Sequence, residues 1–332
     1  MRIFKKIVSV VLRLSVSIIL VVLLFKFNKI DIRNLLGDLK GADKGLLLLA
    51  LAVFFFTYVL CLYRWEMLLK ALDFKLPLKR VIISFSGGVY SSLLLPSTVG
   101  GDFTRSIDLG VHTKRPRAIV ATVLLDRLSG YVGLAILVLF SLFLGWGLIK
   151  NDKSVLISVA VIILILVVIL AVLFNTFLFS RVNKLLNSPK SGKFRESLRN
   201  LHEEMHVFRN NKKVILMNII LSLFIQAVTP ISSYIIALSL GIKMNLIYFF
   251  IFLPIIGAIT LLPISIGGLG LRENMTVLFL AKAGVAKSSA VAISLINFSF
   301  IVVYACIGGL IYVFGVRHRR LQRGASPVIR PD

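Results

Sequence analysis

The apolar blocks of this chain limit its fold more than any other feature of the sequence. Six blocks are long enough for a helix to cross the hydrocarbon core of a bilayer, which takes roughly 20 residues. They cover residues 7–25, 45–63, 118–149, 154–179, 214–241 and 288–315. With 58% hydrophobic and only 16% charged residues, the chain lacks the polar surface that a soluble protein of this length needs. The sequence therefore predicts an all-α polytopic membrane protein with about six full transmembrane helices and no soluble catalytic domain.

The formal net charge of +25 raises the alternative of a nucleic-acid-binding protein. The basic residues, however, cluster between the apolar blocks and do not alternate with aromatic residues on one face. Basic loops are typical of the cytoplasmic side of a membrane, where anionic lipids attract Lys and Arg. The N-terminal head, residues 181–213 and the tail 317–332 are strongly basic. We therefore expect a multi-pass protein of the plasma (inner) membrane, with both termini in the cytoplasm and no nucleic acid as partner.

Two shorter apolar stretches, 81–95 and 246–262, each run into a proline and then a pair of glycines. Backbone groups cannot stay unpaired in hydrocarbon, so a helix that breaks there must be sheltered by protein or face a water-filled cavity. Basic residues place both ends of 81–117 in the cytoplasm, which predicts that this segment enters the membrane and returns as a re-entrant hairpin. The same counting predicts a second hairpin at 246–287 that enters from outside.

Both predicted hairpins carry one motif. LLP-x-x-x-GG-x-x-x-R begins at Leu94 and again at Leu261, a separation of 167 residues. Each copy follows two spans and precedes another, and the charges put the copies on opposite sides of the membrane. This is an inverted-topology repeat, a construction common among alternating-access transporters. It predicts a first repeat at 1–150 and a second at 151–316, which includes an amphipathic cytoplasmic segment at 181–213, followed by a basic cytoplasmic tail at 317–332.

The residue types of the motif predict an anion site. Proline ends a helix, and the glycines permit positive φ and close backbone approach. A helix that restarts after them presents unpaired N–H groups and a positive dipole end, which favour an anion. Arg105 and Arg272 follow about one turn later, with planar forks suited to phosphate. In the alternative interpretation the glycines only allow tight packing, and each arginine snorkels or pairs with Asp102 or Glu273.

A second charged pair, Asp126-Arg127, interrupts the third predicted span. It either balances Arg105 or Arg272 in a central cavity, or lies at the membrane interface because the helix begins later than 118. Both alternatives stay open at this point. The predicted substrate-binding residues are Pro96, Gly100, Gly101, Asp102, Arg105, Asp126, Arg127, Gly267, Gly268, Gly270, Arg272 and Glu273.

Residues 202–206 spell H-E-x-x-H, the signature of zinc proteases. Apolar residues from Phe194 to Phe208 recur at helical spacing on an otherwise charged segment, which is typical of a helix lying on a membrane surface. A catalytic zinc site needs three protein ligands and an enclosed pocket, and the sequence suggests no third ligand nearby. We interpret the match as chance and expect neither a metal nor a catalytic residue.

The paired motifs, in a chain with this many spans, resemble the lysylphosphatidylglycerol synthase transmembrane family, also called flippase-like. The resemblance extends from the first span to about Gly315. It implies a membrane domain that moves aminoacylated or other anionic lipids between leaflets, with the matching motif residues in the site. Some members add a soluble C-terminal domain that transfers an amino acid to phosphatidylglycerol. Because this sequence ends shortly after the last span, we expect neither that domain nor enzymatic activity.

The sequence thus predicts a flippase-like transporter that holds a phosphate-bearing lipid headgroup between two opposed hairpins, with Arg105 and Arg272 on the same phosphate. The ATP-binding pattern G-x-x-x-x-G-K-[ST] does not occur, and we expect no cofactor. Two alternatives remain open. One is a non-transporting membrane partner or regulator of a separate lipid or glycan enzyme, and the other is a carrier for a small soluble anion.

The inverted topology can be tested by labelling single introduced cysteines with a membrane-impermeant reagent. We expect positions between Asp108 and Thr113 to react from the cytoplasmic side, and positions between Ala281 and Ala286 to react from outside. The two hairpins enter from opposite sides, so their ends face opposite compartments. Reaction of both segments from one side would contradict the inverted arrangement.

Overall fold

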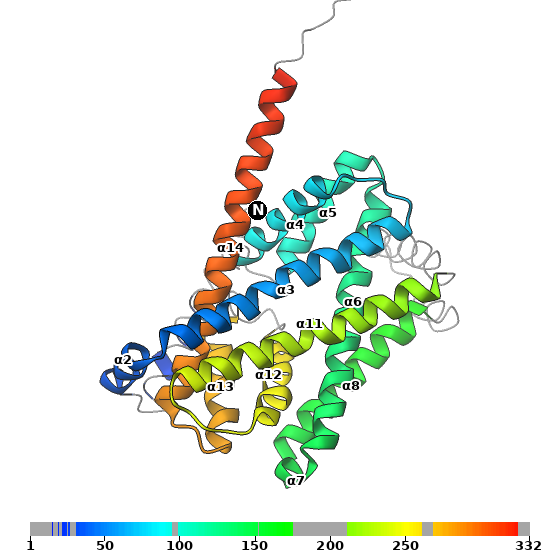
Figure 1. Cartoon of the computed structure of the whole chain (residues 1–332). Helices are drawn as coiled ribbons and strands as arrows, with labels where there is room; N and C mark the ends of the chain where they lie inside the picture. The colour runs from blue at the N-terminus through cyan, green and yellow to red at the C-terminus, as the bar shows by residue number, and fades with distance from the viewer. Residues whose placement is uncertain are drawn as a thin grey trace, which may run out of the picture.

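The structure, a computed structural model, describes residues 31–94, 99–151, 153–174, 211–260 and 268–324, with a few isolated residues between 15 and 26. Over these ranges the chain forms helices joined by short turns (Figure 1). The helices are α2 (Ile32–Gly41), α3 (Lys44–Ala71), α4 (Leu78–Leu94), α5 (Val99–Thr113), α6 (Pro116–Leu144), α7 (Trp146–Ile149), α8 (Lys153–Phe174), α11 (Lys212–Ser239), α12 (Leu246–Thr260), α13 (Leu271–Lys282) and α14 (Lys287–Gly324).

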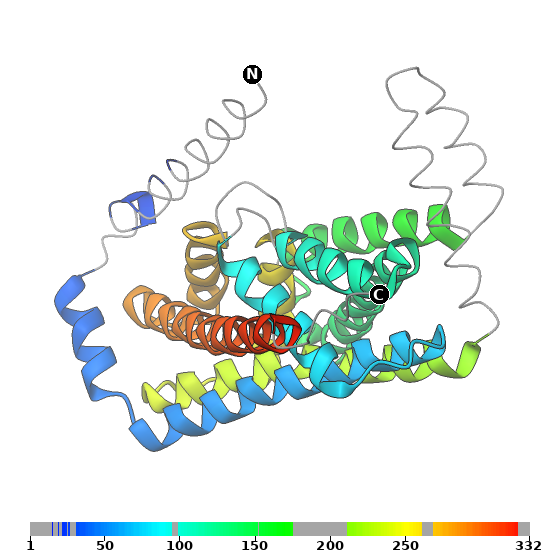
Figure 2. The same ribbon diagram turned by 90° about the horizontal axis from the view of Figure 1, so that it is seen from above.

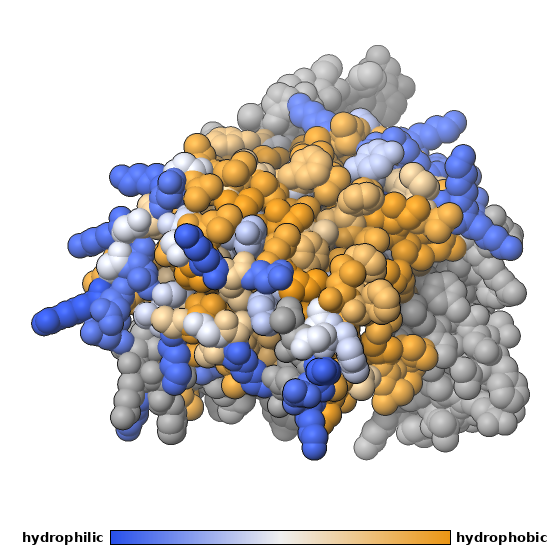
Figure 3. All heavy atoms as spheres, turned by 60° about the horizontal axis from the view of Figure 1, so that its bottom comes forward, coloured by the Kyte–Doolittle hydropathy of each residue, from blue (hydrophilic) through white to orange (hydrophobic). Residues whose placement is uncertain are grey.

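Four of the described helices are long and apolar enough to cross a membrane: α3, α6, α11 and the Lys287–Val316 part of α14. Large apolar side chains such as Phe143 and Phe224 lie exposed on them. Figure 3 shows a broad apolar surface with charged side chains gathered mainly toward its edges. Soluble monomers rarely expose apolar patches of such extent. The described part of the chain is therefore an all-helical, multi-pass membrane protein.

The helices α3 and α11 form an antiparallel pair along one side of the molecule (Figures 1 and 2). Both are 28 residues long. The Asp43 N–H, just before α3, donates to the carbonyl of Ser239 at the end of α11, over 2.9 Å. Toward the other end, the Asn218 amide donates to the Arg64 carbonyl over 3.2 Å. Each contact joins the beginning of one helix to the end of the other.

The helix order of the first half recurs in the second. Long α3 precedes short α4 and α5 and long α6, whereas long α11 precedes short α12 and α13 and long α14. Pro96 and Pro263 are 167 residues apart. If 167 is added to the residue numbers of α3, the result is 211–238, which nearly coincides with Lys212–Ser239 of α11. An inverted repeat requires this order and the antiparallel α3–α11 pair. Which side of the membrane each hairpin enters from stays a prediction.

The first helix of each short pair, α4 or α12, packs against a long helix of the other half. The helix α4 lies along α14, where a Cβ at Gly87 would come within 2.5 Å of the Tyr312 ring and a Cβ at Gly309 within 2.6 Å of the Tyr90 ring. The helix α12 packs on α6 as well as on α11. The small residues let α4 and α14 approach closely.

The predicted span 45–63 ends too early, because α3 continues to Ala71. Its buried face does not end where the apolar run ends. Trp65, Leu68 and Leu69 are each at most 1% exposed, and their spacing keeps them on one side of the helix. Helical packing, and not the length of the apolar run, therefore decides where α3 stops.

Two other boundaries are corrected as well. The predicted span 118–149 is two helices, because α6 ends at Leu144 and the short α7 follows Gly145. The predicted tail 317–332 begins as helix, because α14 continues to Gly324 through Arg, Leu and Gln, which are good helix formers. The span 154–179 is described as α8 up to Phe174.

The span 7–25, apart from its isolated described residues, lies outside the described part of the chain. So do 175–210, with most of the amphipathic segment and the H-E-x-x-H motif, and 325–332 at the end of the tail.

The crossing of α6 and α11 yields a stability prediction. A Cβ at Gly133 would lie 2.8 Å from the Ser222 carbonyl carbon and 2.9 Å from the Leu223 nitrogen. Backbone atoms cannot move aside without separating the helices. We expect Gly133→Ala to destabilise the protein by about 1–3 kcal/mol, measured as a lower thermal unfolding midpoint in detergent.

The matched control is Gly147→Ala, because nothing lies within 4 Å of a Cβ at that position. Alanine is the better helix former, so the control should unfold at the wild-type temperature or above. Equal midpoints for the two variants would show that α6 and α11 do not cross this closely.

Candidate functional site

The glycine pair of the first motif copy lies inside a helix. The helix α5 begins at Val99, so Gly100 and Gly101 form part of its first turn. The prediction of a helix that restarts after these glycines is therefore wrong for this copy. A Cβ at Gly101 would overlap Ser92 Oγ and the Gly88 carbonyl oxygen of α4. Here the glycines serve the close approach of α4 and α5, as the alternative interpretation expected.

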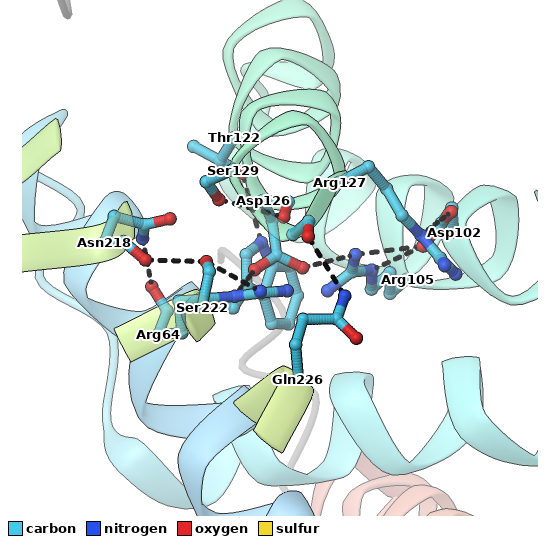
Figure 4. Close-up of polar contacts among 12 residues, drawn as sticks. Arg64, Asp102, Arg105, Thr122, Asp126, Arg127, Ser129, Asn218, Ser222 and Gln226 are labelled. Carbon is cyan, nitrogen blue, oxygen red and sulfur yellow. Dashed lines mark hydrogen bonds and ion pairs between the residues drawn. The ribbon is translucent and has the colours of Figure 1, made fainter. Parts of the chain in front are cut away.

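The next turns of α5 carry the charged part of the site. Asp102 and Arg105 meet Asp126 and Arg127 of α6 and Arg64 of α3, as Figure 4 shows. The contacts form an alternating series, here named the arginine–aspartate chain. They are Arg64 Nε to Asp126 Oδ1 at 2.7 Å, Arg105 Nη2 to Asp126 Oδ2 at 2.9 Å, Arg105 Nη2 to Asp102 Oδ1 at 2.9 Å, and Arg127 Nε to Asp102 Oδ2 at 2.6 Å. Each aspartate thus bridges two arginines, one with each oxygen.

The arginine–aspartate chain is buried at one end and more open at the other. The side chains of Arg64, Asp126 and Arg105 are 5–8% exposed. Asp102 is 13% and Arg127 35% exposed. Removing ions from water is costly unless geometry and hydrogen bonds are good, and charges inside membranes usually have a function. The inner three residues are therefore a fixed base, and Arg127 is the accessible end.

The arginine–aspartate chain has one positive charge in excess, because it contains three arginines and two aspartates. All five side chains line one cavity of about 160 Å³. Arginine forks bind carboxylate and phosphate through paired charge-assisted hydrogen bonds. A positively charged cavity of this kind can bind a small anionic group.

Aromatic residues hold the central arginine in place. The Arg105 guanidinium carbon lies 4.8 Å from the centre of the Trp65 ring and 5.8 Å from that of Phe85. Trp65 is fixed in turn, because its Nε1–H donates to Thr122 Oγ1 over 3.2 Å. Cation–π contacts strengthen where water is excluded. The rings and the two carboxylates together define one orientation for the Arg105 fork.

The second half of the protein reaches this site through α11. Arg64 Nη1 donates to Ser222 Oγ over 3.0 Å, and the Gln226 amide donates to the Gly130 carbonyl over 3.0 Å. The site therefore lies where helices of both halves meet. Sequence reasoning missed Arg64, since it placed the end of the span at residue 63. The apolar spacing that begins at Trp65 was the signal that could have found it.

In the predicted Asp126-Arg127 pair, Asp126 lies inside the protein and Arg127 is partly exposed. The helix α6 begins at Pro116, two residues before the predicted start, and Asp126 is only 3% exposed. The expectation that this helix begins later than residue 118 is therefore wrong. Asp126 balances Arg105, one of the two partners that the sequence suggested for it.

The second motif copy has a different local structure. Gly268 and Gly270 adopt φ of +77° and +80° and precede α13, which begins at Leu271. The Gly270 N–H donates to Glu273 Oε2 over 2.6 Å, and Arg272 Nη2 pairs with Glu273 Oε1 at 2.7 Å. Here the glycines do provide positive φ before a helix, as predicted. The start of α13, however, is capped by its own carboxylate, and its arginine forms a pair without net charge.

Arg272 lines a second, larger cavity of about 400 Å³ and lies over the Phe298 ring at 5.0 Å. Most of its other lining residues are apolar, and the lining comes from α3, α4, α11, α12, α13 and α14. The two cavities share Val89 and Ser92 as lining residues. Arg105 and Arg272 thus belong to neighbouring cavities. Their convergence on one phosphate stays a prediction, and Pro96 and Gly267 lie outside the described residues.

Comparison with known proteins agrees with this architecture. The family model described as lysylphosphatidylglycerol synthase TM region matches residues 10–308. The chain belongs to this family. A UPF0104 membrane protein of Methanothermobacter thermautotrophicus is 24% identical over 279 residues, which cover 78% of this chain and 82% of the relative. The match to the family model includes both motif copies and every residue of the arginine–aspartate chain.

The two buried ion pairs of Asp126 yield a second stability prediction. Asp126→Asn removes the charge shared by Arg64 and Arg105 and leaves two guanidinium groups short of a partner. Breaking a buried ion pair costs about 3–5 kcal/mol. We expect a clearly lower thermal unfolding midpoint for this variant in detergent.

The control is Lys70→Gln, which removes a charge from the exposed Lys70–Glu66 pair, where the lysine side chain is 66% exposed. Exposed pairs contribute little to stability, because water and salt screen them. If Asp126→Asn were as stable as this control, Asp126 would not sit between two buried arginines.

Proposed function

We propose that this protein is a flippase-like transporter that moves an anionic, phosphate-bearing lipid or lipid-linked headgroup between the leaflets of the plasma (inner) membrane. The observation that carries the proposal is the arginine–aspartate chain. It places three arginines and an excess positive charge in a cavity among membrane-spanning helices. A phosphate group is the ligand for which arginine forks are best suited. Membership of the family supports a role in the membrane.

The neighbouring cavity favours a lipid over a small soluble anion. Its lining is mostly hydrocarbon, with side chains such as Leu93, Leu253 and Ile301, and it adjoins the arginine cavity at Val89 and Ser92. A free phosphate would gain nothing from such a surface. An amphiphile with a charged head and an apolar body matches both cavities, because apolar groups gain free energy when they leave water.

The proposed mechanism uses the two halves as alternating gates. Arg105 and Arg127 bind the phosphate, and the aspartates balance charge while the site is empty. Small movements of α4–α5 against α14, and of α12–α13 against α6, open the cavities toward one leaflet and then the other. The ligand shifts the populations of the two states. In this proposal no covalent bond forms and no cofactor takes part, and a gradient or the lipid concentrations set the direction.

The test is lipid translocation in reconstituted vesicles. Purified protein is placed in phosphatidylcholine vesicles that contain fluorescent phosphatidylglycerol, and the fraction open to a quencher outside is followed over time. We expect the wild type to accelerate translocation and Arg127→Gln to slow it about tenfold or more. A charge-assisted hydrogen bond contributes about 1.5–3 kcal/mol, and about 1.4 kcal/mol corresponds to tenfold.

Arg127 is the arginine of choice because it is the most exposed member of the arginine–aspartate chain, so its loss disturbs folding least. Lys70→Gln is the control and should translocate like the wild type. If Arg127→Gln left the translocation rate unchanged, the proposed site would be contradicted. An unchanged rate for Arg105→Lys as well would strengthen that conclusion. No translocation together with stable co-purification of a lipid or glycan enzyme would favour a non-transporting partner.

A further inference from the structure

We propose that the Asp102 carboxylate holds the position on Arg105 and Arg127 that the substrate phosphate takes, and that a phosphodiester headgroup displaces it from these arginines. This inference rests on the proposed function. It identifies the step by which the headgroup enters and the charge class of the headgroup that fits.

The geometry around Asp102 is that of a bound anion. Its Oδ1 accepts hydrogen bonds from Arg105 Nε at 3.2 Å and Nη2 at 2.9 Å, and its Oδ2 accepts from Arg127 Nε at 2.6 Å. A two-oxygen anion held between two guanidinium forks is also how arginines hold phosphate. Carboxylate and phosphate are therefore alternative ligands for the same donors, and both cannot occupy them together.

Asp102 is the exchangeable aspartate because of its position. Its side chain is 13% exposed and its partner Arg127 35%, so an anion that enters the cavity meets this end first. Asp126 lies deeper, between Arg105 and Arg64, and Arg64 is held by Ser222. When Asp102 leaves, Arg105 keeps Asp126 as its counter-ion, and no inner guanidinium is left without a partner.

The two halves differ in how firmly their motif carboxylates are held. Glu273 is tied to the backbone, because its Oε2 accepts the Gly270 N–H, and it is also reached by Ser294 Oγ at 3.3 Å. Among the described residues, the hydrogen bonds to the Asp102 carboxylate come from arginine side chains. A ligand that offers the arginines an equivalent anion can therefore release Asp102 without breaking a helix cap.

The charge balance indicates the class of headgroup. A phosphodiester carries one negative charge, so its binding neutralises the single excess positive charge of the three arginines and two aspartates. The exchange also breaks the Asp102–Arg127 bridge between α5 and α6. Headgroup binding thereby removes one of the two ion pairs that join α5 to α6 and leaves the Arg105–Asp126 pair in place, which connects occupancy of the site to the movement that transport requires.

The experiment compares Asp102→Asn with the wild type in two measurements, the Kd for short-chain phosphatidylglycerol in detergent and the maximal translocation rate in vesicles. Asparagine keeps the shape of the side chain but cannot compete as an anion. We expect the Kd to fall about tenfold or more, as loss of a charged competitor implies. We expect the translocation rate to fall as well, because no carboxylate returns to expel the headgroup.

A purely structural role for Asp102 predicts weaker binding together with a lower unfolding midpoint, which is the opposite result. Asp102→Ser, a second neutral variant, should also bind more tightly, and Asp102→Glu should restore an affinity near that of the wild type. The control Asp73→Asn removes a carboxylate from an exposed turn residue with φ of 58°, a conformation that asparagine tolerates. It should leave both quantities unchanged.

The outcomes separate this inference from the proposed function. Tighter binding by Asp102→Asn without any translocation by the wild type would support the displacement of Asp102 and contradict the proposed transport function. Translocation that depends on Arg127, with equal or weaker binding by both neutral variants, would overturn displacement alone. If the wild type and Asp102→Asn both failed to bind phosphatidylglycerol, both ideas would fall.

Discussion

The alternation of charge along Arg64, Asp126, Arg105, Asp102 and Arg127 is the constraint on which the rest of this structure depends. In a membrane interior each of these charges is tolerable only beside an opposite one. The series therefore fixes α3, α5 and α6 relative to one another, and the hydrogen bond from Arg64 to Ser222 adds α11. Because its two ends are both arginines, the series can be satisfied internally and still attract an anion.

Close helix crossings make this electrostatic arrangement possible. Side chains can bridge three helices only if the helix axes are near one another, and small residues permit that approach. Gly101 lies against Gly88 of α4, one turn before Arg105, and Gly133 lies against Ser222 of α11, two turns after Asp126. Packing and ion pairing therefore depend on each other. The glycines let the helix backbones approach, and the ion pairs fix how the helices are aligned along one another.

The sequence was sufficient for the features that depend on local pattern and insufficient for those that depend on a distant partner. Apolar length predicted α3, α6, α11 and α14, and the repeated LLP-x-x-x-GG-x-x-x-R motif pointed to Asp102 and Arg105. The place of Gly100 and Gly101 inside α5 could not be read, since their packing partner is on another helix. Arg64 was missed because the predicted span ended at residue 63, and its partner Asp126 is 62 residues away in the sequence.

The two copies of the motif share their spacing and differ in their chemistry, and this difference gives the two halves different tasks in the proposed transport cycle. In the second copy, Glu273 caps α13 and neutralises Arg272, beside a cavity lined mostly by hydrocarbon. In the first copy, Asp102 is shared between two arginines, and the site keeps an excess positive charge. A symmetric carrier would bind headgroups equally in both halves. In the proposed transport cycle, this asymmetry assigns the phosphate to the arginines of the first half and the apolar body of the lipid to the larger cavity, which helices of both halves line.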